Sequence, residues 1–335
     1  MPRYANTRER TVPVMSLPDF KYKQIIIHVV RKTGEKLRFR ADNIVIKDAE
    51  GKTVLQHSCH RTFALFIVGD ISVTSVMIRH CVKYHFPIIL MNRSLKIITK
   101  FNCEAEGNTL LRRRQYGASP AHNLDVAKSI IRQKIGNQRK LLLKIRQKSK
   151  EDLKTADYLS SINIDKARNT YELMGMEGLA SRAFFRTYFR QLGWNRREPR
   201  CKRDIANLLL DIGYTWLFQF MESLLSLYGF DLYCGVLHTF FYQRKSLVCD
   251  IVEPFRCIID ARIKKAYNLG QIDEKDFELK DGRYFLNFNK QEKYIALFLK
   301  DILSYKEEMF KFCQSYYRWV ARSGRFEEFP VFSIG

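Results

Sequence analysis

The sequence predicts an α+β fold in which a small β-rich N-terminal domain precedes a larger α-helical domain. Short runs rich in β-branched residues, separated by turn signals, fill residues 24–101. Beyond residue 121, apolar side chains recur at three- and four-residue intervals nearly to the end. Between them the periodicity lapses, at Gly107, Gly117 and Pro120. We therefore expect a domain over 1–101, a linker over 102–120 and a helical domain over 121–335.

The N-terminal domain should begin with successive antiparallel strands. Turn signals at Thr33-Gly34 and Glu50-Gly51 separate these runs, which lie at 24–30, 36–40, 43–47 and 53–56. The pattern then changes to strand, helix, strand and strand, at 64–68, 72–85, 86–91 and 95–101. This domain is thus predicted to contain one helix among its strands.

The second domain should consist of amphipathic helices. Their segments are 123–150, 165–192, 202–227, 251–267 and 291–320. The most apolar stretch, 205–242, is interrupted by Asp211, Glu222 and Asp231, so it predicts a buried helix and not a membrane span. The first residues lack the apolar core of a secretory signal. We expect a cytoplasmic protein with no membrane partner.

The charge of the chain indicates a nucleic-acid partner. Lys and Arg number 58 against 35 Asp and Glu, a formal net charge of +23 that attracts a polyanion. The stretch 111–150 holds 12 basic residues against one acid, and 181–203 holds 8 against one. Solvated helix faces would give the same pattern at either stretch alone. We predict DNA-binding side chains in both, namely Arg112, Arg113 and Arg114 in one, and Arg182, Arg186 and Arg190, spaced as an i, i+4 ladder, in the other.

Glu177 interrupts an apolar helical stripe that includes Leu173, Ala180 and Phe184. A carboxylate in such a place is costly unless it is paired, protonated or bound to a metal. A partly exposed Glu with a basic partner is the alternative. The sequence therefore makes Glu177 a candidate metal ligand.

His238 is the one histidine after His122, and two acids follow it at Asp250 and Glu253. A lone histidine is more often structural than a ligand, but these acids can be brought to it. Asp250 and Glu253 share a face if helical. Their spacing, with Pro254, also fits a helix N-cap. An imidazole with carboxylates suits Mg²⁺ or Mn²⁺ bound to phosphate oxygens.

Other chemistries have weaker support. The cluster around His57, Cys59 and His80 has zinc-ligand residue types without paired zinc-ligand spacing. The sequence shows neither a nucleotide-binding fingerprint nor a recognisable hydrolase nucleophile motif. Nothing in it implies ATP.

Three stretches of the helical half resemble the CRISPR-associated spacer-acquisition integrase family, the first of the numbered core CRISPR proteins. They are MGMEG at 174–178 continuing to SRAFFRTYF at 181–189, RDIANLLLDIGY at 203–214, and GVLH at 235–238 followed by SLVCDIVEPFR at 246–256. The N-terminal half is similar through GDISVTS at 69–75 and PIILM at 87–91. The resemblance spans most of residues 20–320.

The resemblance implies a catalytic helical domain and a metal-dependent transesterification that joins the 3′-OH of a captured DNA fragment to CRISPR repeat DNA. Glu177, His238 and Glu253 match the family's metal ligands, and Asp250 matches the neighbouring acid. Many relatives have Asp where this chain has Glu253, so the resemblance leaves open which acid is the ligand. It also implies a homodimer, double-stranded DNA and a complex with the small second core CRISPR adaptation protein.

Two rival functions remain open from the sequence. A general metal-dependent DNA endonuclease would use water at the same site. A non-catalytic architectural DNA-binding protein would use the acids only as helix caps and ion pairs.

Overall fold

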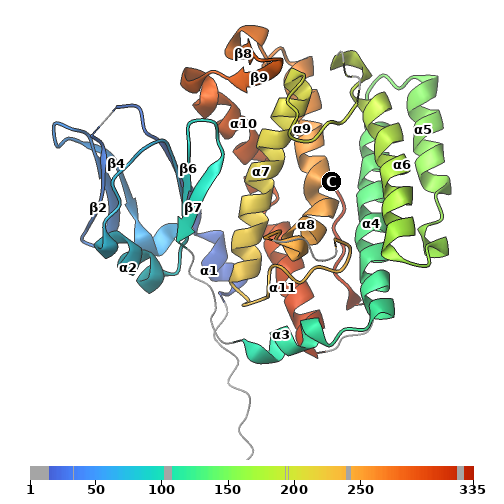
Figure 1. Ribbon diagram of the computed structural model, residues 1–335, viewed down its shortest axis with the longest axis horizontal. Coiled ribbons are helices and arrows are strands. Elements are labelled where there is room, and N and C mark those ends of the chain that lie inside the picture. Colours follow the sequence, from blue (N-terminus) through green and yellow to red (C-terminus); the bar gives the residue numbers. More distant parts are fainter. Residues whose placement is uncertain are drawn as a thin grey trace, which may run out of the picture.

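A computed structural model describes residues 15–32, 34–101, 108–192, 194, 196–238, 243–322 and 328–335. It has a strand-rich N-terminal part beside a body of helices, drawn in blue to teal and in green to red respectively (Figure 1). This confirms the predicted α+β class. Thr33 and residues 102–107 of the expected linker lie outside the described residues.

The N-terminal part contains two sheets and one longer helix, α2 (Ser75–Tyr84). The larger sheet has the order β1-β5-β6-β7, formed by Gln24–Val29, Thr62–Val68, Ile88–Met91 and Ile97–Phe101. The smaller sheet joins β2, β3 and β4, formed by Lys36–Arg40, Asn43–Lys47 and Thr53–Ser58. Its strands pair antiparallel as predicted. The same prediction is wrong for β1, which pairs parallel with β5.

Strand β5 explains this correction, because every one of its residues is buried. An uninterrupted apolar run is typical of a strand covered on both faces and paired in parallel. Leu65 and Ile67 enter the core of the N-terminal part. Phe63 and Phe66 enter the helical core, where their rings meet Phe220 and Trp216. One strand therefore borders both cores.

The helical body begins with α3 (Thr109–Tyr116) and is built around α7 (Ile205–Ser226), which packs against α8 and α9. The other helices of the body are α4 (Pro120–Leu143), α5 (Lys150–Ser161), α6 (Thr170–Tyr188), α8 (Ser246–Val252), α9 (Arg256–Asn268), α10 (Gln291–Ser304) and α11 (Lys306–Arg322). The short helix α1 (Leu17–Lys21) contacts α11. Helix α7 also meets the larger sheet, where Glu222 contacts Lys100 of β7.

Three local features differ from the sequence-based expectation. Helix α3 occupies much of the range expected to be a linker. The predicted helix over 123–150 is two helices, because α4 ends at Leu143 and Ser149 caps α5 through its hydroxyl. A hairpin of β8 (Phe277–Lys280) and β9 (Arg283–Leu286) interrupts the helical region, with Gly282 at positive φ in its turn. The division into domains remains a prediction.

No helix in the described part of the chain combines the length and apolar character needed to cross a membrane.

Candidate active site

Glu177 lies on α6, facing α4. Its helix buries Leu173, Ala180 and Phe184 on the same stripe, as the sequence predicted. The carboxylate Oε1 accepts a hydrogen bond from Ser181 at 2.6 Å and contacts Lys134 Nζ of α4 at 2.5 Å. The side chain keeps 22% of its exposure. Glu177 is therefore a partly buried acid with a basic partner, held at the boundary between two helices.

Glu253 lies opposite, in the one-turn 3₁₀ helix η4 (Glu253–Phe255) that joins α8 to α9. It is buried, with Arg256 at 2.9 Å from Oε1 and Lys134 Nζ at 2.6 Å from Oε2. Burial by itself would raise the pKa of Glu253, but the charges of Arg256 and Lys134 outweigh it and bring this pKa down to about 2. Glu253 is thus a carboxylate at neutral pH.

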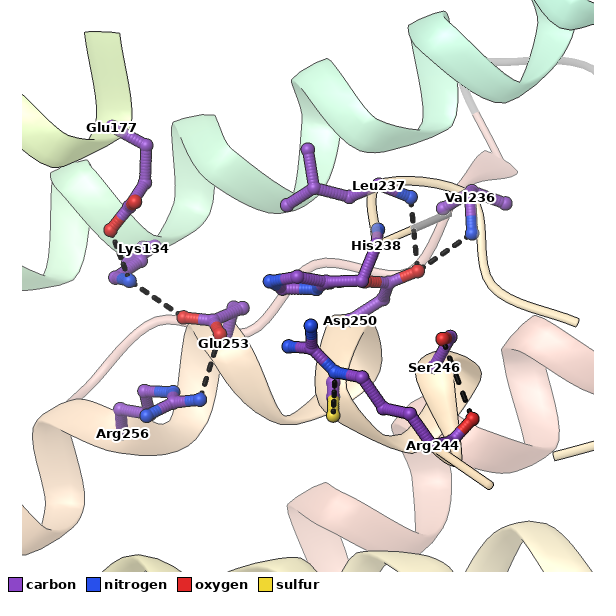
Figure 2. Close-up of polar contacts among 11 residues, drawn as sticks. Lys134, Glu177, Val236, Leu237, His238, Arg244, Ser246, Asp250, Glu253 and Arg256 are labelled. Atoms are coloured by element: carbon purple, nitrogen blue, oxygen red, sulfur yellow. Dashed lines mark hydrogen bonds and ion pairs between the residues drawn. The ribbon is translucent and has the colours of Figure 1, made fainter. Parts of the chain in front are cut away.

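Lys134 joins the two acids, since its one ammonium contacts both carboxylates (Figure 2). The side chain is only 11% exposed. Burial would lower the pKa of Lys134, but the carboxylates of Glu253 and Glu177 outweigh burial and raise it. The site therefore contains one ammonium that forms ion pairs with both carboxylates.

Asp250 and Glu253 have different surroundings although they are one helical turn apart. Asp250 lies inside α8 and is fully buried. Its Oδ2 accepts hydrogen bonds from the N–H groups of Val236 and Leu237 at 2.6 and 3.0 Å. Its Oδ1 accepts from the backbone N–H of His238 at 3.1 Å. The helix-cap alternative is wrong for Asp250, because this residue lies inside α8 and its carboxylate binds the backbone of residues 236–238.

Asp250 also orients the His238 ring, whose Nδ1 lies 2.6 Å from Oδ1 (Figure 2). Because this carboxylate accepts, Nδ1 carries a proton, and among the described residues no hydrogen bond occupies Nε2. The imidazole lies on the same side of α8 as Glu253 in Figure 2.

Gly235 allows the backbone of residues 235–238 to pack closely against α8. A Cβ atom at this position would lie 2.6 Å from Ser246 Cβ and 2.7 Å from Asp250 Oδ2. No side chain fits there without moving α8 or the segment at 235–238. The glycine therefore lets the backbone come close enough for Val236 to reach Asp250.

Carboxylate and imidazole donors suit a hard divalent cation. The side chains would have to move before three of these donors could bind one ion. Among the described residues, no three His, Cys, Asp or Glu side chains converge as metal ligands. Lys134 takes the place between two of the predicted ligands. The contact of Lys134 with Glu253 Oε2 is close but lacks hydrogen-bond geometry, so this buried oxygen has no directed donor. The Lys134 ammonium therefore occupies the position between Glu177 and Glu253 where these acids could bind a metal ion.

The acids lie on the wall of a cavity of 1340 Å³ between α6, α7 and the β9 hairpin. Within the described part of the chain, ten Lys and Arg side chains line it against five Asp and Glu, so it favours a polyanion. Its basic residues come from separate elements and include Lys96, Lys100, Arg200, Lys202, Arg244 and Lys245. The site is therefore open to a phosphate-bearing ligand.

The predicted DNA-binding arginines of the second basic stretch have different surroundings. Arg182 and Arg186 are exposed on α6. The ladder does not continue to Arg190, because α6 ends at Tyr188 and the Arg190 guanidinium pairs with buried Asp152 at 2.8 Å. Arg190 therefore forms a structural ion pair, and DNA binding by it stays a prediction.

The second predicted basic group lies on α3. Arg113 and Arg114 are exposed there, whereas Arg112 donates to the Gly229 carbonyl at 3.2 Å. These positions do not line the cavity. DNA binding by them stays a prediction.

Sequence reasoning missed three side chains of the site, Lys134, Arg256 and Ser181. Lys134 belonged to a basic stretch read as phosphate-binding, and its acid partners are remote in sequence. The spacing of Glu253 and Arg256 was the one local signal, since residues three apart on a helix are neighbours.

An acid and histidine site beside a basic cavity, on an α+β fold, is characteristic of proteins that process nucleic acids. Comparison with known proteins gives the family. The profile of CRISPR associated protein Cas1 matches residues 28–300, and this chain belongs to that family. A curated relative, CRISPR-associated endonuclease Cas1 1 of Thermodesulfovibrio yellowstonii, is 31% identical over 248 residues, which cover 69% of this chain and 77% of the relative. The resemblance seen in the sequence is thereby confirmed.

Two solved structures share the fold. A casposase bound to integration product superposes with a TM-score of 0.75 at 18% identity, covering 90% of this chain and 92% of the casposase chain. A chain of a Cas6-RT-Cas1–Cas2 complex gives a TM-score of 0.79 at 19% identity, covering 93% of this chain and 36% of that longer chain. At these identities the likeness is one of fold.

Proposed function

We propose that this protein is a metal-dependent DNA integrase of CRISPR adaptation, which joins the 3′-OH end of a captured DNA fragment to repeat DNA by transesterification. The observation that carries the proposal is the pairing of Glu177 and Glu253 across one cation, next to an imidazole whose Nε2 is left free by Asp250. Family membership and the names of the relatives support it.

In this proposal Glu177, His238 and Glu253 hold Mg²⁺ or Mn²⁺, and Asp250 acts by positioning His238. A bound divalent ion would supply Lewis-acid stabilisation of the charge that develops on the scissile phosphate. Arg256 keeps Glu253 ionised and fixed. His238 presents Nε2 in one tautomer because Asp250 accepts from Nδ1. None of these roles requires a covalent protein intermediate.

The basic cavity is the proposed path of the DNA backbone towards the acids. Phosphate contacts position a duplex without reading its sequence, which suits an enzyme that accepts arbitrary fragments. The proposed partners are double-stranded DNA, a second copy of this chain and the small second core adaptation protein. The casposase bound to integration product and the Cas6-RT-Cas1–Cas2 complex are the neighbours that support DNA and the second core protein as partners, and the homodimer stays a prediction. A cytoplasmic location stays a prediction.

The test is a joining assay with purified protein, Mn²⁺, a labelled fragment with a 3′-OH end and repeat DNA, with and without the second core protein. Wild type should give joined products, and Glu177→Ala and His238→Ala should reduce the rate at least ~100-fold. Glu172→Ala, an exposed acid on the same helix, is the matched control. Cleavage without joining would favour an endonuclease that uses water.

Wild-type binding without either reaction would favour the architectural alternative. A fragment ending in 3′-deoxynucleotide separates the first two cases, because it can be cleaved but cannot attack.

A further inference from the structure

Lys134 has a position that the proposed reaction does not explain. Its ammonium lies between the two carboxylates that are the proposed metal ligands, at 2.5 Å from Glu177 and 2.6 Å from Glu253. Two cations cannot share that space without strong repulsion. A divalent ion that binds both acids must therefore displace the ammonium from at least one of them.

The neighbours of Lys134 indicate which contacts survive without it. Glu177 keeps a hydrogen bond from Ser181, and Glu253 keeps the ion pair with Arg256. Among the described residues, Arg256 would then be the cation still in an ion pair with these two acids. Like charges in a partly buried site repel strongly, so the carboxylates would separate. Lys134 is what holds them as a pair.

The pairing is also suited to being broken. The Lys134 contact with Glu253 Oε2 lacks hydrogen-bond geometry, and Lys134 lines the cavity. A lysine ammonium is a compact charge on a flexible four-carbon stem. It can withdraw from the acids into the cavity without losing access to water or phosphate.

We propose that Lys134 is a displaceable placeholder cation, which keeps the carboxylates of Glu177 and Glu253 paired without metal and lowers metal affinity by competing for the same oxygens. The inference rests on the metal site of the proposed function. It makes Lys134 a positioning residue that acts through the two acids. Its loss has opposite effects on the metal-free protein and on metal binding.

The experiment compares wild type, Lys134→Met and Lys134→Arg. Lys128→Met is the control on the same helix, where the Lys128 ammonium donates to the Asp165 carbonyl at 3.1 Å, away from the two acids. Thermal unfolding is followed with EDTA and across a Mn²⁺ titration, and Mn²⁺ binding is measured by isothermal titration calorimetry. Neither readout requires DNA or turnover.

Lys134→Met should lower the midpoint of unfolding in EDTA by about 5 °C. Its Mn²⁺ Kd should be about tenfold tighter, so that Mn²⁺ restores the midpoint. Lys134→Arg should unfold like wild type in EDTA but bind Mn²⁺ more weakly, because a guanidinium can hold both carboxylates through its rigid fork. Lys128→Met should match wild type in both measurements.

A purely structural role predicts a different result. Lys134→Met would then lower the midpoint equally with and without Mn²⁺, and the Kd would stay within about twofold of wild type; this outcome overturns the inference. If Lys134→Met does not fold without metal, the test rests on Lys134→Arg. An Mn²⁺ Kd equal to that of wild type in Lys134→Arg would also overturn the inference.

The two proposals fail separately. Absence of Mn²⁺ binding to wild type, or binding unchanged by Glu177→Gln, removes the metal site and the placeholder with it. Binding that needs Glu177 but ignores residue 134 leaves the metal site standing and removes the placeholder alone.

Discussion

Replacing Asp250 by Asn tests whether this residue positions His238. The carboxylate accepts four hydrogen bonds, two at each oxygen, from three backbone N–H groups and the imidazole. An amide has one oxygen, so its NH₂ group must face two of those donors. Losing two hydrogen bonds to a buried charge costs about 1.5–3 kcal/mol each, or roughly 3–6 kcal/mol in the free energy of unfolding.

Local opening of 236–238 would absorb part of this loss, so this figure is an upper bound for global stability. Urea denaturation measures the global part, and amide hydrogen exchange at Val236 and Leu237 measures the local part. The matched control is Glu253→Gln, which lies one turn away and receives no hydrogen bond from this segment.

Asp250→Asn should lose amide protection at both positions and join DNA at least ~10-fold more slowly, whereas Glu253→Gln should keep the protection. Unchanged stability and unchanged exchange in Asp250→Asn would refute the positioning role.

Three further predictions follow from individual contacts. Gly235→Ala forces its Cβ against Ser246 and Asp250, so it should cost about 2 kcal/mol or more in urea denaturation and lower the joining rate; wild-type values would show that the close approach is unimportant. Burial raises the pKa of Asp260 to about 7 from 3.8. The folded chain then holds a proton that the unfolded chain has lost, so the free energy of unfolding of wild type should fall by up to about 4 kcal/mol between pH 4 and 7. In urea denaturation at pH 5 and 8, Asp260→Asn should not show this fall. Arg190→Ala leaves buried Asp152 without its guanidinium, so it should cost about 1–3 kcal/mol while leaving the salt dependence of DNA binding unchanged; a reduced salt slope would restore Arg190 as a phosphate contact.

The sequence was informative where periodicity carries the signal. Glu177 could be singled out because its stripe of apolar neighbours is local to one helix, and the structure buries that stripe. The parallel pairing of β1 was missed because strand order is set by tertiary contacts, although the unbroken apolar run of β5 was visible.

Pairings between distant segments could not be predicted from the residues alone. Lys134 is 43 residues from Glu177 and lies in a stretch where most lysines are exposed to solvent. Asp250 and Glu253 look equivalent in sequence, and only the fold of 235–238 distinguishes them. Arg190 matched a helical ladder in spacing, but α6 ends before it.

The shared strand β5 has a consequence for how the molecule unfolds. Its two faces contribute to two cores, so neither the strand-rich part nor the helical body can come apart while leaving the other's interior covered. The strand-rich part and the helical body should therefore unfold in one cooperative transition and not in two. The backbone amides of Thr62–Val68 should then be among the last to exchange with solvent, and a cut or an insertion in this strand would cost both halves their stability together.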